Sequence, residues 1–167
     1  MICPVCHWQN FLGEDVCENC GADLTSSDTP QPATAFHGAL LGKHLDDLGA
    51  PRPKLVDISA PVGEVIAAMQ AEGLDSVLVT DDGNLVGIFT DRDAVLKVAG
   101  GKSDPRRAIG ELMTADPVVL RREDPVAVAI NKMAVGGFRH VPIVDRGMPI
   151  GVVSAKDVFR HIATRIG

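Results

Sequence analysis

The chain has 167 residues, a net charge of −6 at pH 7 and 46% hydrophobic residues. This size predicts one compact domain with a small appendage, and the acidic balance excludes a general attraction to nucleic acid or anionic lipid. No apolar run approaches the ~20 residues that span a bilayer, and no basic segment followed by an apolar stretch opens the chain. We therefore expect a cytoplasmic protein with no membrane partner.

All four cysteines lie in the first 20 residues as two closely spaced pairs, Cys3 with Cys6 and Cys17 with Cys20. Four thiolates arranged in this way complete a tetrahedral site and leave no open position for catalysis. Residues 1–24 resemble a short zinc ribbon, with zinc the favoured ion and iron the alternative, because S₄ geometry suits both metals. Two disulfides are another interpretation, but they need an oxidising compartment that nothing in the sequence indicates.

The ribbon carries no cation, since the first Lys or Arg of the chain is Lys43. Acidic residues such as Glu14 and Glu18 lie inside it. A surface without cations has nothing to neutralise phosphates, which makes nucleic acid an improbable partner. A structural metal site with a protein-docking role fits the composition better.

Two segments connect the ribbon to the rest of the chain. Residues 25–34 are rich in Ser, Thr and Pro and predict a linker. Residues 35–48 place apolar side chains at near-helical spacing, which predicts a lead-in helix that Gly38 and Gly42 weaken.

The rest of the chain is a tandem repeat, which we divide into units at residues 35–103 and 104–167. Gly87 recurs as Gly151, 64 positions later, and the register holds without a gap over a long stretch. One supersecondary unit is therefore used twice.

Each copy predicts the order β-α-β-β-α. Gly73 and Gly137 end the first helices, and in the second copy Asp124 is the expected N-cap with Pro125 at the first helical position. Tight turns join the second and third strands, and a final helix begins near Arg92 or Lys156. The expected strands are 54–58, 76–80 and 85–90 in the first copy, and 118–121, 140–144 and 149–153 in the second.

The fold class predicted from this order is α/β in the mixed (α+β) sense. Helices cover one face of each sheet, and two such units pack as a pseudo-twofold pair to bury a continuous core.

Each copy also ends in a hydroxyl and a carboxylate three positions apart, Thr90 with Asp93 and Ser154 with Asp157. A helix N-terminus with a hydroxyl suits a phosphate oxygen, and a carboxylate in the first turn accepts ribose hydroxyls. The same pattern is a helix-capping motif, and the two roles are compatible.

The duplicated Gly-apolar-apolar-[Ser/Thr]-x-x-Asp segments, the run 138–145 and the lead-in 111–114 resemble a tandem pair of CBS (cystathionine-β-synthase) domains, a Bateman module. The resemblance runs from about residue 45 to the end of the sequence. It implies a regulatory module that binds AMP, ADP, ATP or S-adenosylmethionine in clefts between the units, and that forms a homodimer.

The resemblance assigns a basic residue near the strand start to phosphate, a role that falls on Arg139 or His140, although His140 also suits a core position. Arg121 adds a cation, and copy one has Ser76 at the position of His140. Apolar strand ends are expected to hold the purine. We predict the Ser154 pocket as the main phosphate site. The candidate nucleotide residues are Ser154, Asp157, Arg139, His140, Val153, Arg121, Thr90, Asp93, Phe89 and Ser76.

No nucleophile elbow and no phosphate-binding Gly-rich loop occur, so we expect no enzymatic activity. The leading hypothesis is a ligand-sensing adaptor that signals to a partner protein. The alternative is a constitutive structural adaptor with empty pockets, whose ribbon docks the partner.

Overall fold

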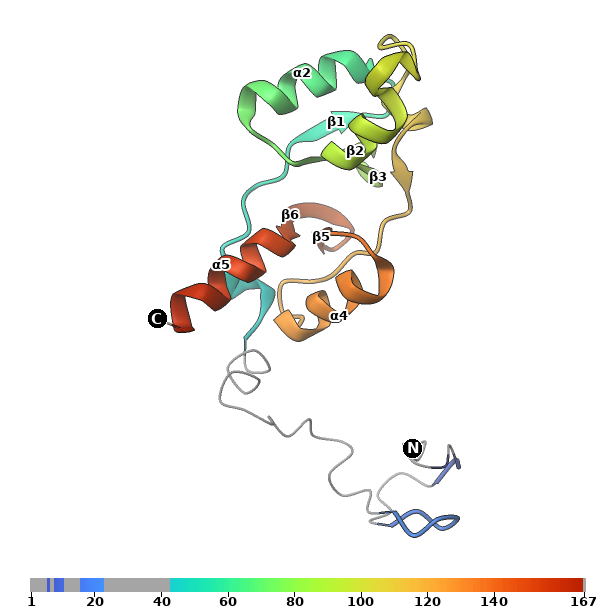
Figure 1. The fold of residues 1–167 in the computed structure, drawn as a ribbon, viewed down its shortest axis with the longest axis vertical. Coiled ribbons are helices and arrows are strands. Elements are labelled where there is room, and N and C mark those ends of the chain that lie inside the picture. The colour runs from blue at the N-terminus through green and yellow to red at the C-terminus, as the bar shows by residue number, and fades with distance from the viewer. Residues whose placement is uncertain (1–5, 7, 11–15, 23–42, 167) are drawn as a thin grey trace. The chain divides into compact units, whose positions relative to one another are not determined.

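The computed structural model describes residues 6, 8–10, 16–22 and 43–166 (Figure 1). The chain divides into two compact units, residues 1–42 and 43–167. The expected linker at 25–34 and the first part of the expected lead-in helix, 35–42, lie outside the described residues, as does Cys3.

The first copy of the repeat forms the elements that its pattern predicts. An apolar stripe on α2 packs on the sheet, and Gly73 ends this helix in the left-handed conformation with φ 64°. The final α-helix has three residues and continues as a π-helix, and Gly100 and Gly101 beyond it adopt positive φ. The elements are η1 (Leu45–Leu48), β1 (Leu55–Asp57), α2 (Val62–Glu72), β2 (Ser76–Asp81), β3 (Asn84–Thr90), α3 (Asp91–Asp93), the π-helix η2 (Ala94–Val98), η3 (Ala99–Gly101), η4 (Ile109–Glu111) and β4 (Thr114–Ala115).

The second copy repeats the helix and the hairpin and ends in a longer helix. Its elements are α4 (Val126–Gly136), β5 (His140–Asp145), β6 (Met148–Ser154) and α5 (Ala155–Ile166). None of the helices in the described part of the chain is long and apolar enough to cross a bilayer.

The two sheets differ at their edges. The first has the order β1-β2-β3-β4, with β1 parallel to β2 and the other pairs antiparallel. The second contains β5 and β6, and the strand expected at 118–121 is reduced to one parallel bridge between Leu120 and Ile143. The short strand β4 has no counterpart among the strands expected from the sequence.

The expected N-cap of α4 is wrong by one residue. Pro125 occupies the N-cap, and α4 begins at Val126. The carboxylate of Asp124 instead accepts a hydrogen bond from the backbone N–H of Arg121, 2.7 Å away. Asp124 therefore closes the turn that precedes the helix.

The lead-in segments are exchanged between the copies. The N–H of Leu45 donates to the carbonyl of Asp124 at 3.0 Å, so η1, which precedes copy one, packs on copy two. The N–H of Ile109 donates to the carbonyl of Ala60 at 2.8 Å, so η4, which precedes copy two, packs on copy one. The two bonds are equivalent under the 64-residue shift, which is what a pseudo-twofold pair requires.

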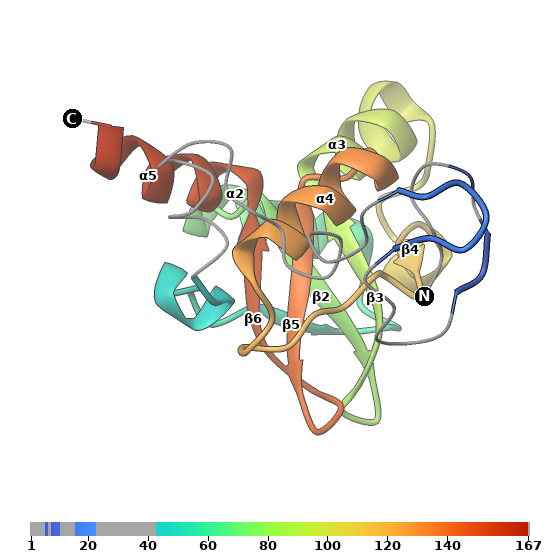
Figure 2. The ribbon, with the colours of Figure 1, turned by 90° about the horizontal axis from the view of Figure 1, so that it is seen from below.

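Each sheet turns one face to its helices and the other to the second sheet. In Figure 1, α2 lies outside the first sheet and α4 and α5 lie outside the second, with the strands between them. Figure 2 shows the two hairpins with their turns at the same end. Buried Leu78, Ile88 and Val152 form the contact between the sheets. The predicted fold class and the stacking of the two units are confirmed.

Candidate functional site

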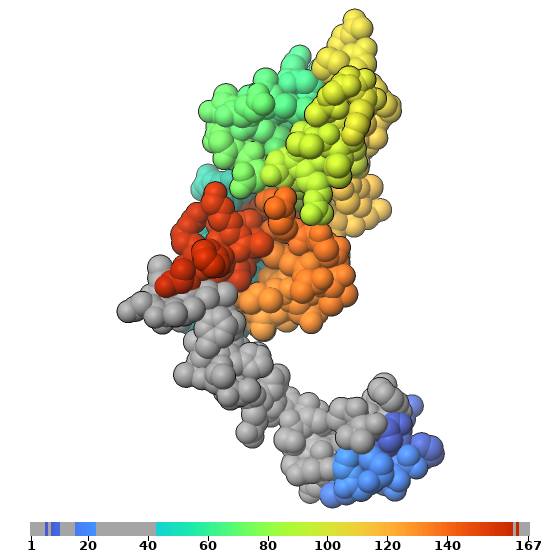
Figure 3. All heavy atoms as spheres, viewed as in Figure 1, coloured from blue at the N-terminus to red at the C-terminus, as the bar shows by residue number. Residues whose placement is uncertain are grey.

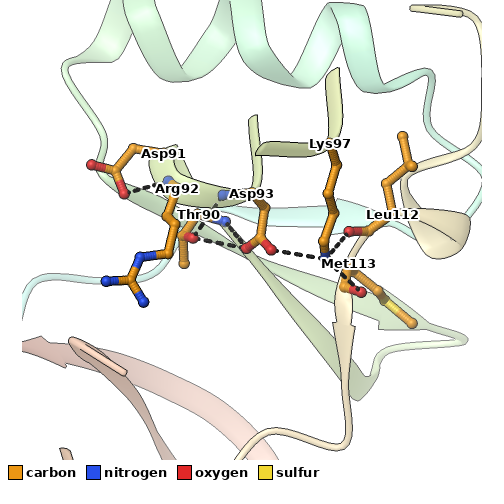
Figure 4. Close-up of polar contacts among 7 residues, drawn as sticks. All are labelled: Thr90, Asp91, Arg92, Asp93, Lys97, Leu112 and Met113. Atoms are coloured by element: carbon orange, nitrogen blue, oxygen red, sulfur yellow. Dashed lines mark hydrogen bonds and ion pairs between the residues drawn. The ribbon is translucent and has the colours of Figure 1, made fainter. Parts of the chain in front are cut away.

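The two hydroxyl–carboxylate pairs form capping boxes. Thr90 Oγ1 donates to Asp93 Oδ2 at 2.7 Å and accepts from the N–H of Asp93 at 3.3 Å, while the N–H of Thr90 donates to the same carboxylate oxygen at 3.0 Å (Figure 4). Ser154 and Asp157 make the equivalent three bonds at 2.6, 3.2 and 2.9 Å. In both boxes one carboxylate oxygen accepts both hydrogen bonds of the cap, and the other contacts a basic side chain, Lys97 or Arg160.

The box of Thr90 opens on the first cleft, a cavity of about 380 Å³. This volume falls within the range of about 300–1,000 Å³ that small-molecule sites occupy. Copy one provides the box and the strand end, and copy two provides the C-terminal end of α4 with Arg139 and His140. The first cleft is lined by Ile88, Thr90, Asp91, Arg92, Asp93, Thr114, Asp116, Pro117, Val118, Gly136, Gly137, Phe138, Arg139 and His140.

The box of Ser154 opens on the second cleft, a smaller cavity of about 180 Å³. Copy one provides the segment before β1 and the start of β2, including Ser76. The second cleft is lined by Pro51, Arg52, Pro53, Lys54, Gly73, Leu74, Asp75, Ser76, His140, Val152, Ser154, Lys156, Asp157 and Arg160.

A central cavity of about 390 Å³ adjoins both clefts. It shares Arg139 and His140 with the first cleft and Ser154 and Lys156 with the second. The three cavities therefore line one face along the junction of the two copies. Figure 3 shows the surfaces of these copies in contact, the first mainly in green and the second mainly in orange and red.

Phe89 and Val153, which were expected to contact the purine, line none of the three cavities. Both side chains are fully buried, and Phe89 belongs to the core beneath α2. Successive residues of a strand point to opposite faces, so the neighbours Ile88 and Val152 line the first and second clefts instead.

The basic residues that line the second cleft come from both copies. The second cleft receives Arg52 and Lys54 from the segment before β1, together with Lys156 and Arg160 of α5. Arg121 lines none of the three cavities described above. Its neighbour Leu120 pairs with Ile143 of β5. Arg121 therefore lies toward the C-terminal end of β5, whereas the cavities lie at the N-terminal end, where His140 begins the strand.

His140 lies at the meeting point of the cavities. Burial lowers the pKa of its imidazole below the usual value of 6.5, against the opposing effect of the Asp91 and Asp75 carboxylates. The guanidinium of Arg139 lowers this pKa further, and the carboxylate of Asp157 raises it. A neutral imidazole at pH 7 is the consequence.

Three of the four cysteines of the N-terminal unit form a cluster. The sulfur atoms of Cys6, Cys17 and Cys20 lie within 4.8 Å of one another. Burial opposes ionisation of Cys17, but hydrogen bonds from the backbone of Cys20 and Asn19 lower the pKa of its thiol to about 6. Thiolates at this spacing are suitable ligands for a tetrahedral metal ion, and Cys3 lies outside the described residues.

The cluster has a polar neighbour that the sequence did not indicate. Asn10 is 4% exposed, and its amide donates to Cys17 Sγ at 3.6 Å and to the carbonyl of Trp8 at 3.2 Å. Its carbonyl oxygen accepts the N–H of Glu18 at 3.1 Å. Such contacts orient a metal ligand, and an Asn four residues after a Cys carries no signal that would find it.

The family model of the CBS domain matches this chain twice, at residues 45–100 and 109–164. The chain belongs to the CBS-domain family. The meiotically up-regulated gene 70 protein of Schizosaccharomyces pombe is 34% identical over 115 residues, a stretch that covers 68% of this chain and 15% of that protein.

Solved CBS structures show the same fold. A CBS-domain-containing protein from Agrobacterium tumefaciens has 31% sequence identity and a TM-score of 0.65, covering 71% of this chain and 98% of that one. A CBS-domain protein from Pyrobaculum aerophilum, solved with AMP, has 23% identity and a TM-score of 0.64, covering 73% of this chain and 99% of that one.

Several residues that line the clefts of this CBS pair were not among the sequence candidates. A continuous apolar run does not show which face of a strand each residue occupies, so Ile88 and Val152 could not be separated from their neighbours Phe89 and Val153. Arg52, Lys54 and Arg160 could not be found either, because they reach the second cleft only through the exchange of lead-ins and the length of α5.

Proposed function

We propose that this CBS pair is a non-catalytic regulatory module that binds an adenosyl ligand between its two copies and reports occupancy to a partner protein. The observation that carries the proposal is the position of both capping boxes, each of which opens on a cavity lined by both copies. The Pyrobaculum relative with the same fold was solved with AMP, which supports the choice of ligand class.

The second cleft is the proposed site for a phosphorylated ligand. It opens at the N-terminus of α5, a helix of 12 residues, whereas α3 has three residues before the backbone changes to a π-helix. A longer helix presents a stronger positive end to an anion. In α3 the N–H of Arg92 donates to the carboxylate of Asp91 at 2.7 Å. The residue of α5 aligned with Asp91 is Ala155, which has no carboxylate to accept the N–H of Lys156.

Asp157 is the proposed ribose acceptor. Its Oδ2 is used by the cap, and its Oδ1 faces Arg160 at 3.5 Å, the limit of a hydrogen bond. Carboxylate oxygens accept the two hydroxyls of a ribose, as the acidic residue of dinucleotide-binding folds does. Phosphate would then meet Arg52, Lys54 or Lys156.

The first cleft is the proposed site for a second adenosyl ligand. Ile88, Val118 and Phe138 provide apolar walls for a purine, and Arg92 and Arg139 lie at its polar side. S-Adenosylmethionine, AMP, ADP and ATP all meet these requirements.

The N-terminal unit is proposed to hold zinc, with iron as the alternative, on Cys6, Cys17, Cys20 and Cys3. Bound metal would fix the fold of this small unit. Trp8 is 51% exposed, which suits a protein-docking role. We also propose a homodimer, since apolar Val135 and Phe159 are 81% and 70% exposed on α4 and α5.

The decisive test is titration calorimetry of the full chain with AMP, ATP and S-adenosylmethionine. Wild-type protein is expected to bind at least one of them, and Asp157→Ala to bind about tenfold more weakly or worse, because a hydrogen bond to a charged group is lost. Asp145→Ala is the matched control, since this exposed aspartate ends β5 away from the clefts.

The self-contained hydrogen bonds of both boxes favour the alternative, a constitutive adaptor with empty clefts. Absence of heat with all three ligands, together with an unchanged melting midpoint, would establish that alternative, because a ligand that binds only the folded state raises the midpoint.

A further inference from the structure

The two boxes differ in the side chain that contacts the aspartate oxygen not used by the cap. In the first cleft Lys97 Nζ lies 2.8 Å from Asp93 Oδ1, and the lysine side chain is 36% exposed. In the second cleft Arg160 Nη1 lies 3.5 Å from Asp157 Oδ1, and the arginine side chain is 66% exposed. The first contact is a short, half-buried ion pair, and the second is a long one in solvent.

Lys97 is held at three points. Besides Asp93, its ammonium donates to the carbonyl of Leu112 at 2.6 Å and lies 3.4 Å from the carbonyl of Met113 (Figure 4). An ammonium has three donors, and these partners use all of them. Moving Lys97 away from Asp93 therefore disturbs a complete set of hydrogen bonds, whereas Arg160 can leave Asp157 for water.

The acceptor count differs between the clefts as a result. A carboxylate accepts about four hydrogen bonds. Two are used by the cap in each box, and Lys97 takes a third from Asp93, which leaves one for a ligand. Asp157 keeps two once Arg160 moves. A ribose offers two neighbouring hydroxyls, so only the second cleft can accept both.

The sequence difference behind this asymmetry lies within the repeat. Under the 64-residue shift, Lys97 corresponds to His161, so the lysine is specific to copy one. The carbonyls that hold it belong to the exchanged lead-in of copy two, whose continuation through Asp116 and Val118 lines the same cleft.

We infer that Lys97 is a specificity-determining residue: it occupies Asp93 and makes the first cleft insensitive to one of the two ribose hydroxyls. This inference rests on the proposed function. The first cleft then accepts adenosyl ligands modified at the 2′ or 3′ position, whereas the second cleft requires the intact diol.

The test compares AMP with 2′-deoxy-AMP by titration calorimetry on the full chain. Asp157→Ala weakens ligand binding in the second cleft, so the binding that this variant retains measures the affinity of the first cleft. We expect AMP and 2′-deoxy-AMP to bind Asp157→Ala within about threefold of each other. Adding Lys97→Met is expected to make 2′-deoxy-AMP about tenfold weaker than AMP, the factor for one hydrogen bond to a freed carboxylate.

Two controls accompany this variant. Lys97→Arg retains a cation at the position and should keep the wild-type ratio. Lys102→Met removes a lysine whose ammonium bonds the Leu96 carbonyl outside the cavities, and it should also leave the ratio unchanged. If Lys97→Met lowers the melting midpoint below the assay temperature, Lys97→His, which introduces the residue of the aligned position, gives the same comparison.

An unchanged ratio in both Lys97→Met and Lys97→His, with AMP still bound, would overturn the inference and leave the proposed function intact. Loss of all AMP binding in Asp157→Ala would overturn the inference alone, because the first cleft would then be no adenosyl site. Failure of the wild-type chain to bind AMP, ATP or S-adenosylmethionine would remove the proposed function as well.

Discussion

At the scale of residues, the clefts depend on polar groups whose partners come from the other copy. Arg92 Nη1 donates to the carbonyl of Gly137 at 3.2 Å, and Arg139 Nη2 lies 3.9 Å from Asp91 Oδ1. These contacts are exposed and contribute little to stability by themselves. Their effect is to keep the strand starts and helix N-termini of the two copies facing each other.

His140 gives a testable pH dependence of stability. Its pKa in the folded state is lowered, first by burial and also by Arg139, although Asp91, Asp75 and Asp157 oppose the shift. The unfolded chain therefore binds the proton more readily. The stabilisation associated with neutral His140 is present above about pH 6.5, the unfolded value, and is lost as the pH falls through the folded pKa.

We expect the melting midpoint of the wild-type chain to fall more steeply between pH 7.5 and 5 than that of His140→Gln. Calorimetric melts of both proteins at matched ionic strength measure the difference. Parallel curves would show that His140 is not the titrating group.

At the scale of elements, the repeat in the sequence predicts most of the fold but fewer of the residues that line the clefts. Hairpin turns, helix ends at Gly73 and Gly137, and the strand starts are local features that turn chemistry and periodicity specify. Phe89 was expected at the purine, but it lies in the core, and its neighbour Ile88 lines the first cleft. A continuous apolar run does not reveal its faces, because both sides of this strand are covered.

The exchange of lead-ins could not be predicted, because repeat periodicity does not say which copy a connecting segment packs on. Met113 shows the result, since its sulfur lies where a Cβ on Gly87 of β3 would be. The edge strand β4 follows from that exchange, because it belongs to the lead-in of copy two and pairs with β3 of copy one.

The start of α2 gives an element-scale prediction. Alanine normally stabilises a helix relative to glycine by about 1 kcal/mol. At Gly63, however, a Cβ would lie 2.8 Å from Pro105 Cβ and 3.1 Å from the Pro105 carbonyl oxygen. Gly63→Ala is therefore expected to lower the free energy of unfolding by about 1–3 kcal/mol.

Urea denaturation measures this change. The aligned position in α4 is Ala127, and Ala127→Gly should lower stability by about 1 kcal/mol through helix propensity alone. A higher midpoint for Gly63→Ala would mean that the packing of α2 against Pro105 is looser than the structure indicates.

At the scale of the whole molecule, residues 43–167 form one compact unit although they contain two matches to the CBS model. The N–H of Val126 at the start of α4 donates to the carbonyl of Lys43 at 2.8 Å, and the N–H of Val62 donates to the carbonyl of Arg107 at 2.9 Å. Each helix start is thus completed by a residue from the lead-in of the other copy.

This arrangement predicts that residues 104–167 alone do not unfold cooperatively. Such a fragment lacks the segment that completes the start of α4, and its own lead-in has no sheet to pack on. Circular dichroism melts of residues 43–167 and 104–167 make the comparison, with a sigmoidal transition expected only for the longer fragment. A cooperative transition of monomeric 104–167 would contradict the prediction.

The crossed lead-ins also constrain how such a molecule can arise. A polypeptide with a single copy would leave its lead-in and the start of its first helix without hydrogen-bond partners. It would satisfy both by exchanging lead-ins with an identical molecule. Joining two such molecules end to end turns a concentration-dependent association into a fixed one, after which each half is free to diverge. Lys97 in copy one and His161 at the aligned position of copy two are such a difference, which a symmetric dimer of identical chains could not have.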